Sequence, residues 1–191
     1  MHVQLIPVLE VSHPSPALVP FAPGLPFYRA ATMELNHLKK VVADHLQGYI
    51  KGEYGADGIG SLWGGYVLRI DNTNVLFPQC CGELSDIIFW KHVALKNQNA
   101  YYNGHPGPVA SFSEHEVILH CTDSYESFVP DTAAVTRVPK TALAAAYTQA
   151  VQELEVLERL ITQIGQHLAM PINNLAHLLI YRNAEMPAEL P

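Results

Sequence analysis

Apolar residues recur with a period of two in several parts of the chain, and this pattern predicts strands. Residues 2–11 are rich in Val, Leu and Ile in partial alternation, and Pro7 favours a strand near a sheet edge. Residues 63–70 and 75–77 predict two more strands, joined by a polar hairpin turn at 71–74. Residues 109–112 and 116–121 predict a further antiparallel pair.

Two long segments show helical spacing instead. Between residues 30 and 51 apolar positions recur every three or four residues, which is typical of an amphipathic helix. Near the C-terminus the four-three spacing is unbroken over Leu143, Tyr147, Ala150, Leu154, Leu157, Ile161, Ile164 and Leu168. A coiled-coil dimer would use such a stripe, but apolar residues at 151, 156 and 160 widen it, so we favour a helix packed on its own domain. Shorter helices are expected over 83–95 and 174–181.

These elements predict an α+β fold. A small antiparallel sheet from residues 2–11, 63–77 and 109–122 would be covered by the amphipathic helix near 31–51 and the long C-terminal helix near 140–168. The chain is expected to form a single α+β domain over 1–191, with residues 140–182 as its C-terminal helical part. Five prolines make residues 12–27 an extended connector, and its interleaved apolar residues suggest that it lies on the body of the domain.

Composition narrows the classes of function. Of 191 residues 49% are hydrophobic and 15% charged, which is typical of a folded domain. The net charge of −7 disfavours nucleic acid as a partner and leaves room for a basic protein. No apolar run approaches the roughly 18 residues of a membrane span, and the N-terminus lacks a basic leader. With three cysteines in a poor disulfide pattern, we expect a cytoplasmic protein that has no membrane contact.

The adjacent pair Cys80 and Cys81 comes directly before an expected helix. A helix N-terminus lowers a thiol pKa, so either cysteine could serve as the nucleophile of a hydrolase or transferase, with His115 or His120 as base and Asp123 orienting it. Alternatively the two thiols are buried packing residues beneath Trp63 and Trp90. We favour burial, because Phe77, Leu84 and Phe89 flank the corner. The sequence thus favours a binding protein over an enzyme.

A metal or cofactor site is not expected. His115, His120, Cys121 and Asp123 offer zinc donors together with the cysteine pair, but neighbouring strand positions would point to opposite faces. No phosphate-binding loop, His-Glu-x-x-His motif or paired Cys-x-x-Cys motif is present.

Three stretches carry a resemblance to a group of bacterial proteins. They are Trp63-Gly64-Gly65-Tyr66, the corner from Phe77 to Asp86, and Gly104-His105-Pro106-Gly107-Pro108. In these the chain resembles the small cytosolic immunity proteins of polymorphic toxin systems. The resemblance implies an α+β domain without a catalytic site that binds and neutralises one toxin.

The leading hypothesis is therefore a protein-binding module of the immunity or inhibitor type, with a cysteine-dependent hydrolase or transferase as the alternative. Aromatic anchors usually dominate such interfaces, so Trp63, Tyr101 and Tyr102 are candidate contacts in or beside glycine-rich loops. A basic toxin domain would also meet the nearby carboxylates Glu53, Asp57 and Asp71. The chain itself would be a monomer or a homodimer.

Overall fold

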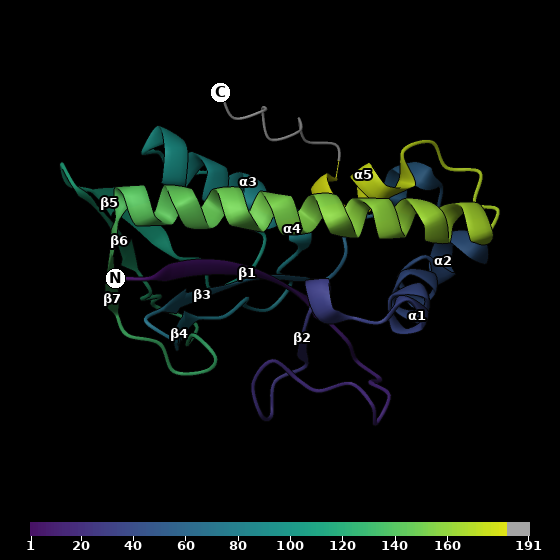
Figure 1. Cartoon of the computed structure of the whole chain (residues 1–191), viewed down its shortest axis with the longest axis horizontal. Helices are drawn as coiled ribbons and strands as arrows, with labels where there is room; N and C mark the ends of the chain where they lie inside the picture. Colours follow the sequence, from purple (N-terminus) through teal and green to yellow (C-terminus); the bar gives the residue numbers. More distant parts are fainter. Residues whose placement is uncertain (183–191) are drawn as a thin grey trace.

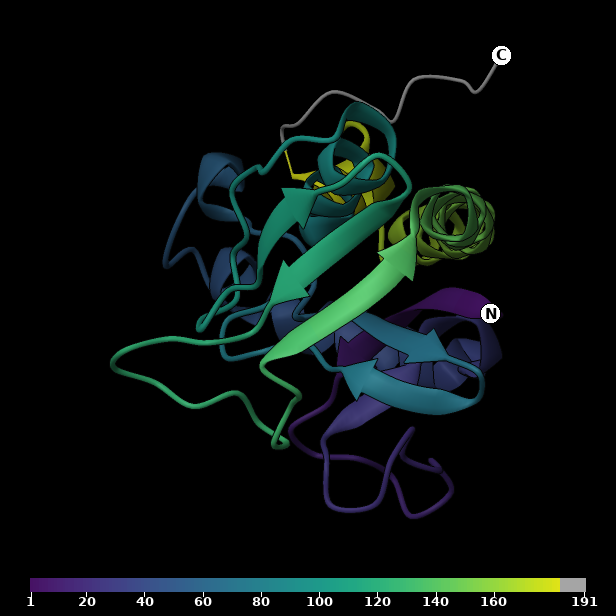
Figure 2. The ribbon, with the colours of Figure 1, turned by 90° about the vertical axis from the view of Figure 1, so that its left-hand side faces the viewer.

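The computed structural model describes residues 1–182, and residues 183–191 of the expected domain lie outside this range. Its strands form two separate antiparallel sheets, which Figure 2 shows one above the other. The larger sheet has the order β2-β1-β3-β4 and consists of β1 (Val3–Glu10), β2 (Phe27–Arg29), β3 (Gly64–Ile70) and β4 (Thr73–Leu76). The smaller has the order β5-β6-β7 and consists of β5 (Val109–Phe112), β6 (Glu116–His120) and β7 (Val135–Pro139).

The helices are unequal in length. The α-helices are α1 (Leu35–His45), α2 (Gln47–Ile50), α3 (Ile87–Lys91), α4 (Lys140–His167) and α5 (Leu175–Tyr181). Shorter turns are the 3₁₀ helices η1 (Ala30–Thr32), η2 (Ala56–Gly58) and η3 (Leu84–Asp86) and the π-helical turn η4 (His92–Lys96). Mixed helices and antiparallel sheets confirm the α+β class. None of the described helices is both long enough and apolar enough to cross a membrane.

The expected strands are present, but they do not share one sheet. Residues 109–120 pair with β7, a strand that lies in a segment expected to be irregular, and not with the strands of residues 2–11 and 64–70. β6 is the central strand of this second sheet, with β5 on one side and β7 on the other. The sequence of β7 has only five residues and ends in Pro139, so its strand signal is weak.

Strand β1 is buried on both faces, and its side chains alternate between two apolar clusters. Val3, Leu5 and Leu9 face the main core, whereas Ile6 and Val8 face a smaller cluster with Phe27, Val67 and Phe77. Residues 21, 22 and 25 of the proline-rich connector pack on that second cluster. The connector therefore lies on the body of the protein, as its apolar residues predict.

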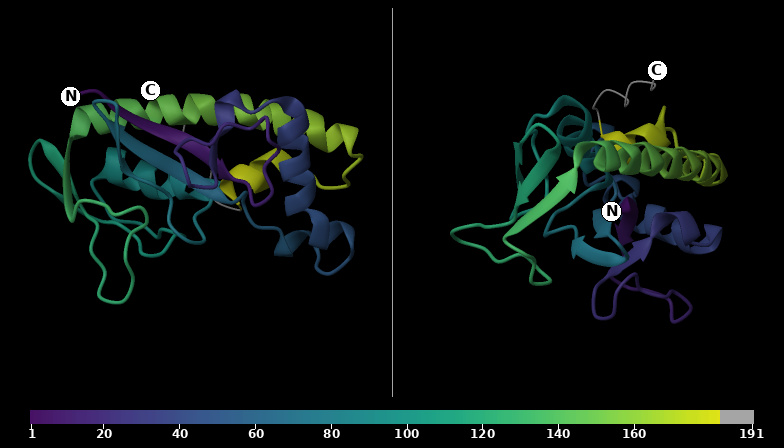
Figure 3. Two further views of the ribbon diagram at one scale, coloured as in Figure 1. Left: turned by 90° about the horizontal axis from the view of Figure 1, so that it is seen from below. Right: turned by 60° about the vertical axis from the view of Figure 1, so that its left-hand side comes forward.

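Helix α4 covers the other face of the larger sheet along the length of the molecule (Figures 1 and 3). Its apolar stripe from Leu143 to Ile164 is buried in the main core against β1 and α5, whereas Val156 on the outer face is 43% exposed. Because the stripe is already covered within one chain, the packed-helix interpretation accounts for it without a coiled-coil partner.

Candidate functional site

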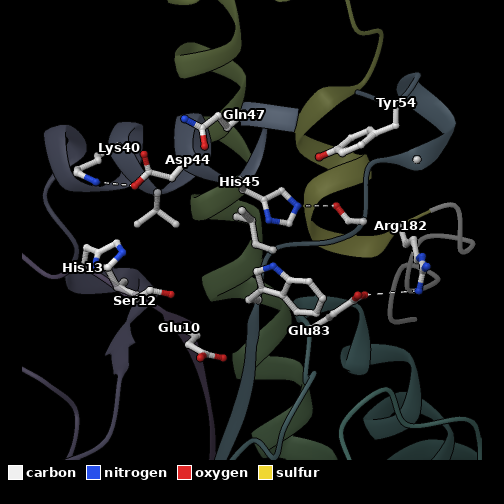
Figure 4. A pocket seen from close by; sticks show the side chains of 16 residues that line it. Glu10, Ser12, His13, Lys40, Asp44, His45, Gln47, Tyr54, Glu83 and Arg182 are labelled. Atoms are coloured by element: carbon white, nitrogen blue, oxygen red, sulfur yellow. Dashed lines mark hydrogen bonds and ion pairs between the residues drawn. The ribbon is translucent and has the colours of Figure 1, made fainter. Parts of the chain in front are cut away.

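A hollow of ≈ 730 Å³ lies where the end of β1 meets α1, the loop after α2 and residue 63. Figure 4 shows polar side chains around it, with His45 near the middle, Lys40 and Asp44 on one side and Tyr54 and Arg182 on the other. The elements that form the wall are distant in sequence. The hollow, called the Trp63 hollow below, is thus a product of tertiary folding.

Trp63 is the most prominent apolar group of this hollow, because 47% of it is exposed. Its backbone is fixed on both sides: the Glu10 amide donates to its carbonyl oxygen over 3.0 Å, and it forms a β-bridge with Glu83. Its indole packs edge-on against the ring of His45, with the ring centres 6.3 Å apart. Fixed backbone contacts therefore hold the large side chain of Trp63 in an exposed position.

His45 is the half-buried neighbour of this indole. Its Nε2 donates to the carbonyl oxygen of Gly60 over 3.0 Å. Burial lowers the pKa of His45 below its usual value, an effect that outweighs the Gly60 hydrogen bond and the charge of Glu83. The ring is consequently neutral near pH 7 and serves as a packing surface for Trp63.

The charges around the hollow are only partly balanced. Lys40 pairs with Asp44 at 2.5 Å, and Arg182 lies 3.7 Å from the buried carboxylate of Glu83. Glu10 forms no ion pair within residues 1–182. The hollow thus combines an exposed aromatic ring with a carboxylate that lacks a counter-charge.

The other predicted contact residues are dispersed. Glu53 and Asp57 are exposed and flank Tyr54 of the hollow, whereas Asp71 lies at the opposite end of β3 and accepts a hydrogen bond from the His2 amide over 2.7 Å. Tyr101 is 81% exposed. Tyr102 is half-buried and packs edge-on against Phe89 with the ring centres 5.1 Å apart. Of the predicted set, Trp63, Glu53 and Asp57 therefore belong to one region.

The expected burial of the cysteines is wrong, because both Cys80 and Cys81 are exposed. Phe77 and Leu84 are buried as expected, but Cys81 has a φ of 65°, so the chain reverses there and the thiols point outward. The two tryptophans do not cover them either, since Trp63 stands half-exposed in the hollow and Trp90 is buried in the main core. The two sulfurs lie 3.5 Å apart.

A histidine does lie beside the cysteines, but it is neither of those expected. A ring nitrogen of His105 and the two sulfurs all lie within 4.8 Å of one another. Nδ1 of His105 lies 2.9 Å from Oε2 of Glu126. His120 instead contacts Ser111 on the second sheet, and His115 lies beside Glu114 in the turn between β5 and β6. Cys80, Cys81, His105 and Glu126 are called the cysteine corner below.

Backbone and buried side-chain contacts hold this corner together. The His105 amide donates to the Cys80 carbonyl oxygen over 2.9 Å. Gln79 is buried and exchanges hydrogen bonds of 2.8 and 3.1 Å with the backbone of Val129, which fixes the loop that carries Glu126. The carboxylate of Asp123 accepts from the amides of Tyr125 and Glu126, and these bonds lower the pKa of Asp123. Asp123 thus positions the turn before Glu126 and does not orient a histidine.

The helix after the cysteines does not activate them. Its first amides already have partners: Glu83 and Asp86 form a capping box, the Leu84 amide donates to the Leu62 carbonyl oxygen, and the Ser85 amide donates to the Ser61 hydroxyl. The pKa of Cys81 is raised, first by its hydrogen bond with Cys80 and further by burial and by the charges of Cys80, Glu10 and Glu83. This thiol is therefore protonated near pH 7, which disfavours it as a nucleophile.

His105 and Glu126 have no sequence signal of their own. His105 lies in a Gly- and Pro-rich loop, and Glu126 is one of several acidic residues in an irregular segment. Their link to the cysteines comes from the backbone bridge between Cys80 and His105.

Comparison of the chain with protein-family models, curated proteins and solved structures finds no match in any of the three.

Proposed function

We propose that the protein is a binding module of the immunity or inhibitor type, which neutralises a toxin in the cytoplasm by direct contact at the Trp63 hollow. One observation carries the proposal: Trp63 is half-exposed and fixed by its backbone beside a polar hollow. A tryptophan held in that way is the type of residue that dominates protein interfaces, because it buries a large apolar area at little cost in conformational entropy.

The charge of the protein favours a basic partner. The chain carries a net charge of −7, and Glu10, Glu53 and Asp57 lie in or beside the hollow. Such carboxylates speed encounter with a positively charged surface and disfavour acidic competitors. Within the hollow, the pairs Lys40–Asp44 and Arg182–Glu83 leave Glu10 as the carboxylate available to an incoming cation.

The test screens the proteins encoded next to the gene for this chain for one whose toxicity is relieved on co-expression, and then measures its binding by calorimetry. Trp63→Ala should weaken binding by roughly 30-fold or more, the level of an interface hot spot. Tyr125→Ala is the matched control, because Tyr125 is 96% exposed and does not line the hollow. Equal binding by the Trp63→Ala variant and the wild type would refute the proposal.

The alternative of a cysteine-dependent hydrolase or transferase keeps one favourable observation. The thiols are exposed and lie beside His105, whose Nδ1 faces Glu126. Neither the capped helix nor the raised pKa of Cys81 supports a thiolate nucleophile, so we place this alternative second.

A further inference from the structure

We propose that Cys80, Cys81 and His105 form a binding site for a thiophilic divalent cation, with Zn²⁺ as the expected ion. The donor set is two thiols and one imidazole, which is among the combinations that bind Zn²⁺ in proteins. The three donor atoms all lie within 4.8 Å of one another. The three donors are separate from the proposed protein interface, since none of them lines the Trp63 hollow, although Glu10 lines both hollows.

The spacing of the sulfurs fits this role. In a tetrahedral site with Zn–S bonds of about 2.3 Å, two sulfur ligands stand roughly 3.8 Å apart. The Cys80 and Cys81 sulfurs are 3.5 Å apart. Coordination would therefore change the sulfur–sulfur distance little, and a ring nitrogen of His105 already lies within 4.8 Å of both sulfurs.

His105 is also oriented in the way that metal-binding histidines usually are. Its Nδ1 donates to Oε2 of Glu126 over 2.9 Å, which leaves Nε2 as the nitrogen with a free lone pair. A carboxylate behind an imidazole fixes the ring and strengthens its lone pair, and this arrangement is common around bound zinc. Gln79 and Asp123 in turn fix the loop that carries Glu126.

The backbone of Cys81 gives an independent indication. Its φ of 65° lies in the left-handed region, where a residue with a Cβ is strained and glycine is not. A packing role does not explain a cysteine at this position, because its side chain is exposed. A ligand role does explain it, since the chain reversal brings two consecutive side chains to the same side.

The surroundings suit a cation with an open coordination position. Cys80, His105, Glu126 and Glu10 line a shallow hollow of ≈ 500 Å³, so two carboxylates lie close to the donors. Three protein ligands leave a fourth position for water or for a ligand from that hollow. This resembles the open arrangement of reactive zinc sites more than the closed arrangement of purely structural ones.

The experiment titrates the reduced, metal-free full chain with Cd²⁺ and follows the ultraviolet sulfur-to-metal charge-transfer band, with Zn²⁺ then measured by competition. We expect one ion per chain, and loss of the band in Cys80→Ser and in Cys81→Ser. Glu126→Gln should weaken binding by about 10- to 100-fold, as is usual when the carboxylate behind a ligand histidine is lost. His115→Ala is the matched control, because His115 is another exposed histidine beside a carboxylate, Glu114.

Cys81→Gly separates a ligand role from a role in folding. Glycine accepts the φ of position 81, so the melting temperature should stay the same or rise while Cd²⁺ binding is lost. Equal Cd²⁺ binding by the wild type and the Cys80→Ser/Cys81→Ser double variant would overturn the proposal. The proposal would also be overturned if the wild type takes up no Cd²⁺ and one of its thiols is alkylated rapidly by iodoacetamide. If that alkylation depends on His105, it would support the nucleophile alternative.

Discussion

The Trp63 hollow and the cysteine corner meet at the segment from Cys80 to Glu83, whose cysteines belong to the corner and whose Glu83 lines the hollow, yet they are constructed in different ways. The hollow gathers side chains from β1, α1, α2 and the loops on both sides of residue 60, and its main apolar group is one exposed indole. The corner joins three loop segments through a backbone bridge and one buried glutamine, and its donors are small. A wide surface with an aromatic anchor suits a protein partner, whereas a tight cluster of S and N donors suits an ion.

Glycines connect the two regions. The Gly64 amide donates to the Gly82 carbonyl oxygen over 2.9 Å, directly between Trp63 and Cys81. A Cβ at Gly82 would lie 2.7 Å from the carbonyl oxygen of Gly64. The comparison therefore shows that neighbouring regions with separate chemistry can depend on one closely packed backbone contact.

The largest effect is expected from a charge in the shared core. Leu154→Asp, and likewise Leu157→Asp, should lower the free energy of unfolding by roughly 4 kcal/mol, because an unpaired carboxylate would be buried on the α4 stripe. Both regions should then lose their folded structure together in urea unfolding. Val156→Asp on the exposed face of the same helix is the control and should change stability by less than about 1 kcal/mol. Near-wild-type stability of both core variants would show that the stripe is not core.

The second-largest loss of stability is expected from a substitution at Gly64, which connects the two regions. Gly64 has a φ of +141°, and a Cβ there would clash with the Val8 carbonyl oxygen and lie 2.9 Å from Leu9 Cα. Gly64→Ala should cost roughly 3 kcal/mol, because either β1 or β3 must move. Gly60→Ala is the control, since a Cβ at position 60 would lie 3.6 Å from Oε1 of Glu83, which is an ordinary van der Waals distance. Thermal unfolding measures both variants, and equal melting temperatures would contradict the close packing described.

The next effect concerns the loop that carries His105. Asp86 is 1% exposed and accepts hydrogen bonds of 2.8 Å from the amide and side chain of Asn103 in that loop. Burial raises the pKa of Asp86 to about 6, so the folded state binds a proton there that the unfolded state has already lost. This contribution to stability is present below about pH 4 and is lost as the pH rises through 6.

Asp86→Asn removes this titration while keeping a side-chain oxygen for Asn103. Relative to this variant, the wild type should lose roughly 3 kcal/mol between pH 4 and pH 7, measured by urea unfolding at several pH values. A difference in stability that does not vary with pH would mean that the carboxylate is ionised throughout.

The Trp63 hollow should respond to pH in the opposite direction, with the smallest of these effects. Burial lowers the pKa of His45, so as the pH falls below 6.5 the unfolded state binds a proton before the folded state does, and stability is lost. Urea unfolding at several pH values should show this loss of stability as the pH falls. The His45→Gln variant should not show the transition, and an unchanged transition in that variant would assign it to another group.

The sequence predicts the scaffold better than the sites. Strong periodicity identifies α4, β1 and the β3–β4 hairpin, whose turn residues Asp71 and Asn72 have the positive φ values typical of tight hairpin turns. It does not identify β7, nor the division into two sheets, because strand pairing depends on contacts between distant segments. The sequence offers Trp63 only as a candidate contact beside glycines, and the structure leaves 47% of it exposed. The corner was misjudged because apolar neighbours suggest burial, whereas the backbone at Cys81 turns the thiols outward and brings His105 from a loop 24 residues later.

The central claim is that the Trp63 hollow, and not the cysteine corner, binds a protein. The most direct measurement is a calorimetric titration of the partner identified by the co-expression screen into the wild type, Trp63→Ala and the Cys80→Ser/Cys81→Ser double variant, all shown to be folded. We predict that Trp63→Ala weakens binding by roughly 30-fold or more, while the cysteine variant binds within about 3-fold of the wild type. Strong binding by Trp63→Ala together with loss of binding by the cysteine variant would contradict the account.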